Sequence, residues 1–195
     1  MSWTVIEVSG MGGLTQTQMD DNARMVKAHF NTWTLNAVAG MLGNMVQESG
    51  INPGAWQGAI NDTRHGFGLV QWTPATKVIN WCNESGLAYL NGENQCRRID
   101  YEKANGLQYY KTAAWPLTFQ QFTQSADTPE NLAAAFLANY ERAGTAALAT
   151  RQHWARYYYD LLGGSTPTPP DPPGPEPPAP VKIPIFILKK KRRWL

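Results

Sequence analysis

One carboxyl group stands out because of its place in a helical pattern. Glu48 lies in GNMVQESGINPGAW, an apolar, helix-patterned run that stops at Ser-Gly-Ile-Asn-Pro. A carboxyl group at the C-terminal end of a helix faces the negative end of the helix dipole, and apolar neighbours such as Met45 and Val46 keep water away. Both effects favour the protonated form, which general acid catalysis of glycosidic bond cleavage requires. The alternative is a solvated Glu48 without a catalytic role.

A second carboxyl group, that of Asp62, is the candidate base or nucleophile. It follows Asn61 in a stretch rich in turn residues, and an Asn-Asp pair is equally ordinary in a turn without catalytic function. The separation of two catalytic carboxyl groups is about 5–5.5 Å for retention of configuration and about 6.5–9.5 Å for inversion. Since sequence gives no distance, both outcomes stay open.

Helical periodicity predicts the elements that position these groups. Apolar residues recur on one helical face after Thr15 and again after Thr34. In the second of these helices, Gly40 and Gly43 allow close contact with another helix. This helix is expected to end near Gly50.

The pattern then changes to turn residues. Residues 52–72 are rich in Asn, Asp and Gly, which predicts a small hairpin region ending in the strand-like FGLVQW. Thr73 and Pro74 favour a helix start, in which Thr caps the helix and Pro occupies its first turn. This helix is expected to end near Gly86.

The same start occurs again later in the chain. Thr128-Pro129 predicts a helix that stops at Gly144, and residues 148–162 predict a last helix. The expected fold class is α+β and mainly α, with a small β-hairpin region between helices.

Three stretches resemble the motifs of the lysozyme and lytic transglycosylase superfamily, in the version found in phage tail-associated lysozymes. They are Glu48-Ser49, Gly68-Leu69-Val70-Gln71-Trp72 and Asn139-Tyr140-Glu141-Arg142. The similarity covers roughly residues 20–162 and is most specific in GMLGNMVQESGINPGAW and GFGLVQWTPATK. The resemblance implies a lysozyme-like, two-lobed domain with a cleft, and cleavage of the β-1,4 glycan backbone of peptidoglycan.

The resemblance also implies roles for single residues. It makes Glu48 the general acid and places Gly68 and Gln71 along the sugar cleft, with Ser49 as a further substrate-binding candidate. Gln71 offers a hydrogen-bond donor and an acceptor for an N-acetyl or hydroxyl group, and Gly68 lets a sugar ring approach the backbone.

Two aromatic residues have two interpretations each. Trp72 is either a stacking platform for a sugar or a core tryptophan. Tyr140 could steer the substrate or Glu48 through its hydroxyl group. The neighbouring Glu141 and Arg142 are expected to form a structural ion pair beside the cleft.

The type of cleavage stays open. If Asp62 points away, Glu48 could act alone, and the resemblance then implies attack by the substrate's own hydroxyl group with a 1,6-anhydro product instead of hydrolysis. Muramidase and glucosaminidase action use the same kinds of groups. The chain shows no His, Cys and Asp arrangement for a peptide-cleaving domain, so glycan cleavage alone is expected.

Composition separates a globular part from a tail. Residues 1–164 contain 11 Lys and Arg against 13 Asp and Glu, so nucleic-acid binding by this part is not expected. No metal-ligand spacing is present, and no metal or cofactor is predicted. Cys82 and Cys96 either form a disulfide or are two buried thiols. Neither a signal peptide nor a run of about 18 apolar residues is seen, which predicts a protein made in the cytoplasm without a membrane span.

The remaining residues predict a linker and a docking segment. Residues 165–180 hold nine prolines, and in polyproline II geometry they would extend roughly 50 Å. Residues 181–195 combine an apolar run with six basic residues and no acidic ones. We expect this segment to dock on another phage tail protein, or alternatively to contact an anionic membrane surface.

The expected function is that of a virion tail-associated peptidoglycan hydrolase that opens the bacterial wall during infection. One alternative is a catalytically silent tail plug or wall-binding module with the same fold. Another is an endolysin released at host lysis.

Overall fold

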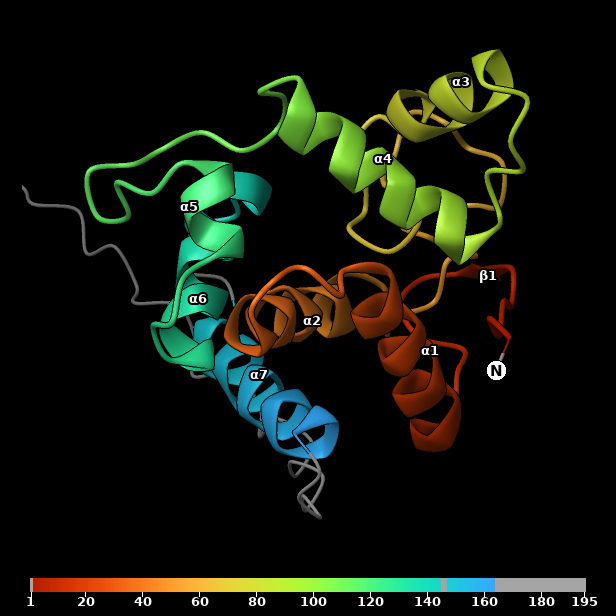
Figure 1. Ribbon diagram of the computed structural model, residues 1–195. Helices are drawn as coiled ribbons and strands as arrows, with labels where there is room; N and C mark the ends of the chain where they lie inside the picture. Colours follow the sequence, from red (N-terminus) through yellow and green to blue (C-terminus); the bar gives the residue numbers. More distant parts are fainter. Residues whose placement is uncertain (1, 145–146, 164–195) are drawn as a thin grey trace, which may run out of the picture.

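The computed structural model describes residues 2–144 and 147–163, and this part of the chain is mainly helical (Figure 1). The elements are β1 (Val8–Ser9), α1 (Gln16–His29), α2 (Leu35–Ser49), β2 (Ala55–Trp56), α3 (Thr76–Glu84), α4 (Gly92–Ala104), α5 (Phe119–Thr123), α6 (Pro129–Phe136), η1 (Leu137–Glu141) and α7 (Leu148–Leu162). The predicted mainly α fold with a small β region is confirmed. The predicted linker and docking segment, residues 165–195, lie outside the described residues.

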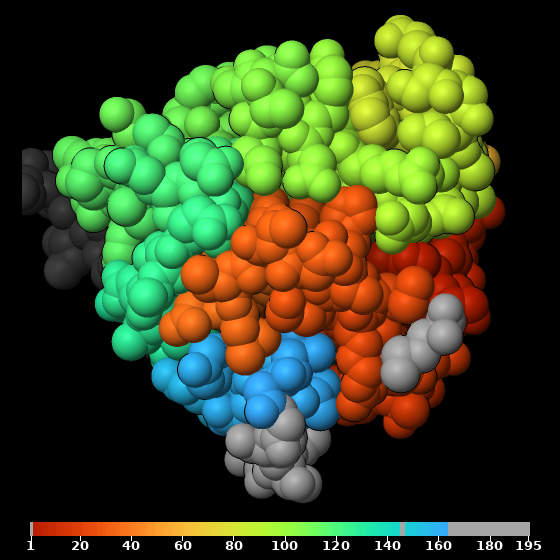
Figure 2. Space-filling view, viewed as in Figure 1, coloured from red at the N-terminus to blue at the C-terminus, as the bar shows by residue number. Residues whose placement is uncertain are grey.

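Helix α2 lies at the centre of the fold. It packs against α6 and α7, while α3 and α4 lie together in another part of the molecule (Figure 1). In the space-filling view the orange residues around α2 are bordered by green α4 and blue α7 (Figure 2). A Cβ atom on Gly40 would lie 2.8 Å from the backbone of Leu132 in α6, and one on Gly43 would collide with the carbonyl oxygen of Arg151 in α7. The predicted close helix contact at both glycines is confirmed.

Most predicted helix boundaries are confirmed by their caps. Thr15 and Thr34 accept hydrogen bonds from backbone N–H groups in the first turns of α1 and α2. Helix α6 begins at Pro129 after Thr128, and α7 has the predicted bounds. Helix α2 ends at Gly50, whose φ of 63° is in the left-handed region.

Two local predictions around the hairpin region are wrong. Helix α3 begins at Thr76, and Thr73 donates its hydroxyl hydrogen to the Gln71 carbonyl instead of capping a helix. The segment 67–72 is a tight turn and not a strand, because Gly68 and Gln71 have φ angles of 80° and 48°. Phe67 instead makes isolated bridges that close this turn.

The two-stranded sheet uses other residues. β1 and β2 are parallel, with Val8 opposite Ala55. The sheet joins the N-terminal segment to the chain that follows α2, so both lie beside the end of that helix. Ala55 of β2 also accepts a hydrogen bond of 2.9 Å from the backbone N–H of Gly68, so the sheet helps to fix the position of the 67–72 turn.

Cys82 and Cys96 are both free and buried in the core, which supports the free-thiol interpretation over the disulfide. Burial raises the pKa of both thiols, so they stay protonated at neutral pH. Across the described ranges, no helix combines the length and the apolar character that a membrane span requires.

Candidate active site

A cleft of about 290 Å³ lies where α2, the 67–72 turn and the end of η1 meet. Its lining residues are Gly10, Met11, Glu48, Gln57, Val70, Gln71, Thr73, Lys77, Gln108, Glu141, Arg142 and Ala143. Polar side chains predominate, and two of them, those of Glu48 and Glu141, carry carboxyl groups. The cleft therefore has the groups that acid and base chemistry requires.

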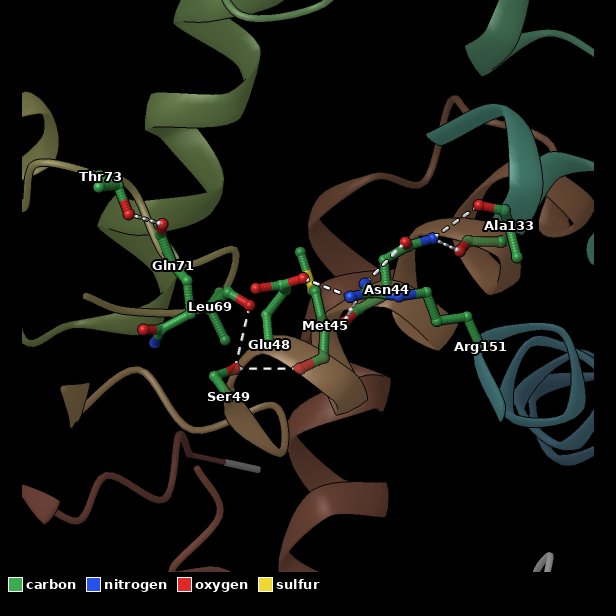
Figure 3. Close-up of polar contacts among 10 residues, drawn as sticks. Asn44, Met45, Glu48, Ser49, Leu69, Gln71, Thr73, Ala133 and Arg151 are labelled. Atoms are coloured by element: carbon green, nitrogen blue, oxygen red, sulfur yellow. Dashed lines mark hydrogen bonds and ion pairs between the residues drawn. The ribbon is translucent and has the colours of Figure 1, made fainter. Parts of the chain in front are cut away.

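Glu48 lies in the last turn of α2, as predicted, and its side chain is 18% exposed. Its Oε1 accepts a hydrogen bond of 2.7 Å from Nη2 of Arg151 in α7. Figure 3 shows the Glu48 carboxyl group between Arg151 on one side and the turn that contains Gln71 on the other. The carboxyl group is thus fixed from the protein side and borders the cleft.

A buried polar network holds Arg151 in place (Figure 3). The Arg151 side chain is only 4% exposed, and its Nη1 donates to Oδ1 of Asn44 at 2.9 Å. Asn44 in turn donates through Nδ2 to the carbonyl oxygens of Gly40 and Ala133, both at 3.0 Å. Because Asn44 and Glu48 are four residues apart on α2, they lie on one face and bind the same guanidinium group. A buried charge requires such partners.

Glu141 is the last residue of η1, a π-helical turn that continues α6. Its Oε1 is buried and has no hydrogen-bond partner among the residues that the structure describes. Burial raises the pKa of Glu141 well above its usual value, and the nearby carboxyl groups of Glu48 and Glu102 raise it further. Arg151 and Arg142 offset these effects only in part. Glu141 therefore keeps its proton at a pH where an ordinary glutamate has lost it.

The ion pair predicted between Glu141 and Arg142 is not formed. Within the part of the chain that the structure describes, Arg142 donates to the Gln108 carbonyl and lies 5.1 Å from the ring of Tyr110. Its left-handed backbone, with φ of 57°, ends η1. Arg142 still lines the cleft.

Ser49 and Gln71 connect the end of α2 to the turn. Ser49 is buried and donates to the carbonyl oxygens of Met45 and Leu69, so its hydroxyl group supports the turn from below the cleft. Gln71 lines the cleft, and its Nε2 donates to the Ala55 and Gly68 carbonyls at 3.1 and 3.0 Å. Gln71 is thus held in a fixed orientation beside Glu48.

Gly68 is required by the protein's own packing. A Cβ atom at this position would lie 2.6 Å from Oε1 of Gln95, which accepts the backbone N–H of Leu69. Gln95 also donates to the Pro53 carbonyl, so one buried amide fixes both ends of this region. Gly68 does not line the cleft, and the structure therefore gives packing, rather than the approach of a sugar, as the reason for glycine.

Trp72 and Tyr140 both lie in the core, where they bind the same carboxyl group. Trp72 is 1% exposed and donates through Nε1 to Glu102, and the buried hydroxyl group of Tyr140 donates to the other oxygen of Glu102. A covered ring cannot stack on a sugar, so the core interpretation of Trp72 holds. The predicted contact of Tyr140 with Glu48 is replaced by the bond to Glu102.

Asp62 lies outside the cleft lining, in the exposed turn that follows β2. Arg64 donates to both of its carboxylate oxygens, at 2.9 and 2.7 Å, and His65 lies 3.5 Å away. The hydrogen bonds from Arg64 hold the pKa of the Asp62 carboxyl group well below its usual range. The structure therefore does not bring Asp62 into the cleft with Glu48.

Sequence reasoning missed two buried charged residues. Arg151 carried no signal, because nothing in its helix marks it as buried. Glu102 lies four residues after Arg98, and this spacing is typical of a surface pair. Instead Glu102 is 1% exposed and joins α4 to the turn and to η1 through Trp72 and Tyr140.

The fold, the carboxyl-lined cleft and the sequence comparisons together define a phage lysozyme-like protein. Residues 18–162 match the phage tail lysozyme family, and the chain belongs to that family. Over 158 residues, which are 80% of this chain, it is 40% identical to morphogenesis protein 1 of Bacillus phage B103. The matched part is 43% of the length of that relative. The resemblance noted from the sequence is confirmed.

Proposed function

We propose that the protein cleaves the β-1,4 glycan backbone of peptidoglycan with Glu48 as the general acid. The observation that carries this proposal is the position of Glu48, which borders a polar cleft and is fixed by the buried Arg151. Membership in the phage tail lysozyme family supports the substrate class. The polar lining of the cleft also suits a sugar chain, whose hydroxyl and N-acetyl groups need hydrogen-bond partners.

In this mechanism a glycan strand lies in the cleft with one glycosidic oxygen beside Glu48. Glu48 protonates that oxygen as the bond to the anomeric carbon breaks, and a positive charge develops on the sugar ring. Gln71, whose Nε2 donates to two backbone carbonyls, presents its Oε1 to the strand as an acceptor. Water or a hydroxyl group of the same sugar then completes the reaction, with a reducing end or a 1,6-anhydro end as the product.

Digestion of purified peptidoglycan tests this proposal. The wild-type chain and Glu48→Gln are incubated with the same preparation, and soluble fragments are followed over time. Loss of a general acid lowers rates about 10²- to 10⁴-fold, so the variant should release almost nothing. Equal release by both proteins would remove Glu48 from the mechanism. Wall binding without release by either protein would favour the silent binding module.

We further propose that the protein acts from the phage tail and that residues 181–195 dock on another tail protein. The name of the relative, morphogenesis protein 1, supports a role in the particle. Purified virions should contain the chain, whereas an endolysin would be found only in the lysate. Attachment through apolar contacts should resist high salt, while binding to an anionic surface should weaken steeply with it.

A further inference from the structure

Glu141 faces the same cleft as Glu48, and the mechanism above gives it no role. Glu141 is the last residue of η1 and lines the cleft. π-Helical turns are rare in proteins, and those that occur are frequently found at functional sites. Two carboxyl groups in one cleft are the minimum that acid and base steps in glycoside cleavage normally use. The position of Glu141 therefore raises the question of what it does.

The two carboxyl groups of the cleft have different partners. Oε1 of Glu48 accepts a charged hydrogen bond from Arg151. Oε1 of Glu141 is buried and accepts no hydrogen bond within residues 2–144 and 147–163. An ionised carboxylate left in this way would carry a large desolvation cost, whereas a protonated carboxyl group carries a smaller one. The geometry alone therefore favours the protonated form of Glu141.

The charges around Glu141 give the same result. Glu48 on α2 and Glu102 on α4 face it with negative charge, while Arg151 on α7 and its neighbour Arg142 face it with positive charge. Arg151 is already bound to Glu48, and Arg98 is bound to Glu102. Burial and the two carboxyl groups outweigh the cations, so the pKa of Glu141 is raised.

Lys77 on α3 also lines the cleft. Its charge is a further cation facing the pair formed by Glu48 and Glu141.

We propose that Glu141 is the second carboxyl group of the active site and acts together with Glu48 on the glycosidic bond. This inference rests on the proposed glycan cleavage. The proton passes from the pair to the leaving oxygen, which keeps the electron pair of the broken bond. The carboxylate left by this step faces the positively charged sugar. Addition of water, or of the sugar's own hydroxyl group, to the anomeric carbon releases a proton that returns to the pair.

The test is the pH–rate profile of peptidoglycan digestion by the full chain, from about pH 4 to about pH 9. Glu141→Gln keeps the size and the neutral charge of a protonated glutamate but cannot release a proton. We expect a loss of about 100-fold or more, with the alkaline limb of the profile moved to lower pH. Glu141→Asp should restore part of the rate, because it restores the carboxyl group. Glu84→Gln, at an exposed position outside the cleft, is the matched control.

The outcomes separate this inference from the proposed function. A folded Glu141→Gln variant that keeps the wild-type rate and the alkaline limb of the profile would overturn the role of Glu141. If Glu48→Gln is inactive in the same assay, the proposed function still stands. A loss that is equal at every pH and is not restored by Glu141→Asp would also overturn it, because that result indicates a structural role. If the wild-type chain releases no glycan fragments, the proposed function and this inference both fail. Circular dichroism and thermal unfolding establish that each variant is folded.

Discussion

The Asp62 turn and the cleft both place carboxyl groups beside an arginine, with opposite chemical results. In the turn, Arg64 binds both oxygens of one carboxylate, and its side chain is 83% exposed. In the cleft, Arg151 is buried and binds Glu48, while Oε1 of Glu141 accepts no hydrogen bond from the residues that the structure describes. The turn therefore holds a carboxylate ion, and the cleft holds a proton. Burial, and the repulsion between neighbouring carboxyl groups, decide which acid keeps its proton.

Replacement of the arginine in each region, Arg151 in the cleft and Arg64 in the turn, should give the largest difference in free energy of unfolding. Arg151→Met leaves Glu48 and Asn44 without their buried partner, and breaking a buried charge pair costs about 3–5 kcal/mol. Arg64→Met breaks an exposed pair, which contributes at most about 1 kcal/mol. Urea unfolding of both variants beside the wild type measures the difference. Equal free energies of unfolding for the two variants would contradict the contrast between the regions.

A smaller effect on the cleft is expected from a substitution at the contact between α2 and α7. A methyl group at Gly43 would collide with the Arg151 carbonyl, so Gly43→Ala should push α7 away from α2. Overpacking of this kind costs about 1–3 kcal/mol. We expect lower stability together with a lower digestion rate, because Arg151 moves with its helix. A stable Gly43→Ala protein with full activity would show that this contact does not set the site.

The pH dependence of stability tests the proton held in the cleft. The pKa of Glu141 is raised in the folded chain, so its contribution to stability is largest at low pH and falls as pH rises from the unfolded toward the folded pKa. Glu141→Gln removes this fall. Relative to the wild type, the variant should gain stability in urea unfolding as pH rises from the unfolded toward the folded pKa of Glu141. If the difference in free energy of unfolding between the variant and the wild type does not change with pH, Glu141 titrates as an ordinary glutamate.

The smallest effect is expected in the turn. Asp62→Asn removes a carboxylate outside the cleft lining, and substitutions at such surface positions change free energies by about 0.5 kcal/mol or less. The rate of peptidoglycan digestion should stay within about twofold of the wild type. A much larger loss would restore Asp62 as the second catalytic acid and would remove the distinction between the two regions.

The sequence predicts elements whose signals are local. Thr15, Thr34 and Thr128 mark helix starts through their own side chains, and the apolar periodicity of α2 follows from its burial between α6 and α7. Helix α4 lacks such a pattern, because several of its buried residues are polar, including Gln95 and Glu102. A periodicity of apolar residues cannot indicate a helix that is buried through hydrogen bonds.

The same limit applies to the candidate site. Glu48 can be located from the sequence because its position at a helix end is local. Asp62 is an ordinary turn residue because Arg64, two residues away, binds its carboxylate. The sequence shows both residues but not the bond between them. Arg151 is 103 residues from Glu48, and only the packing of α7 on α2 brings the two together. Partners at such separations leave no spacing to recognise.

The most direct measurement is mass spectrometry of the fragments that the full 195-residue chain releases from purified peptidoglycan. Cleavage of the glycan backbone predicts disaccharide units with their peptides still attached, with reducing ends for hydrolysis or 1,6-anhydro ends for transglycosylation. Intact glycan strands with cut peptides, or a wall that binds the protein and releases nothing, would contradict the account.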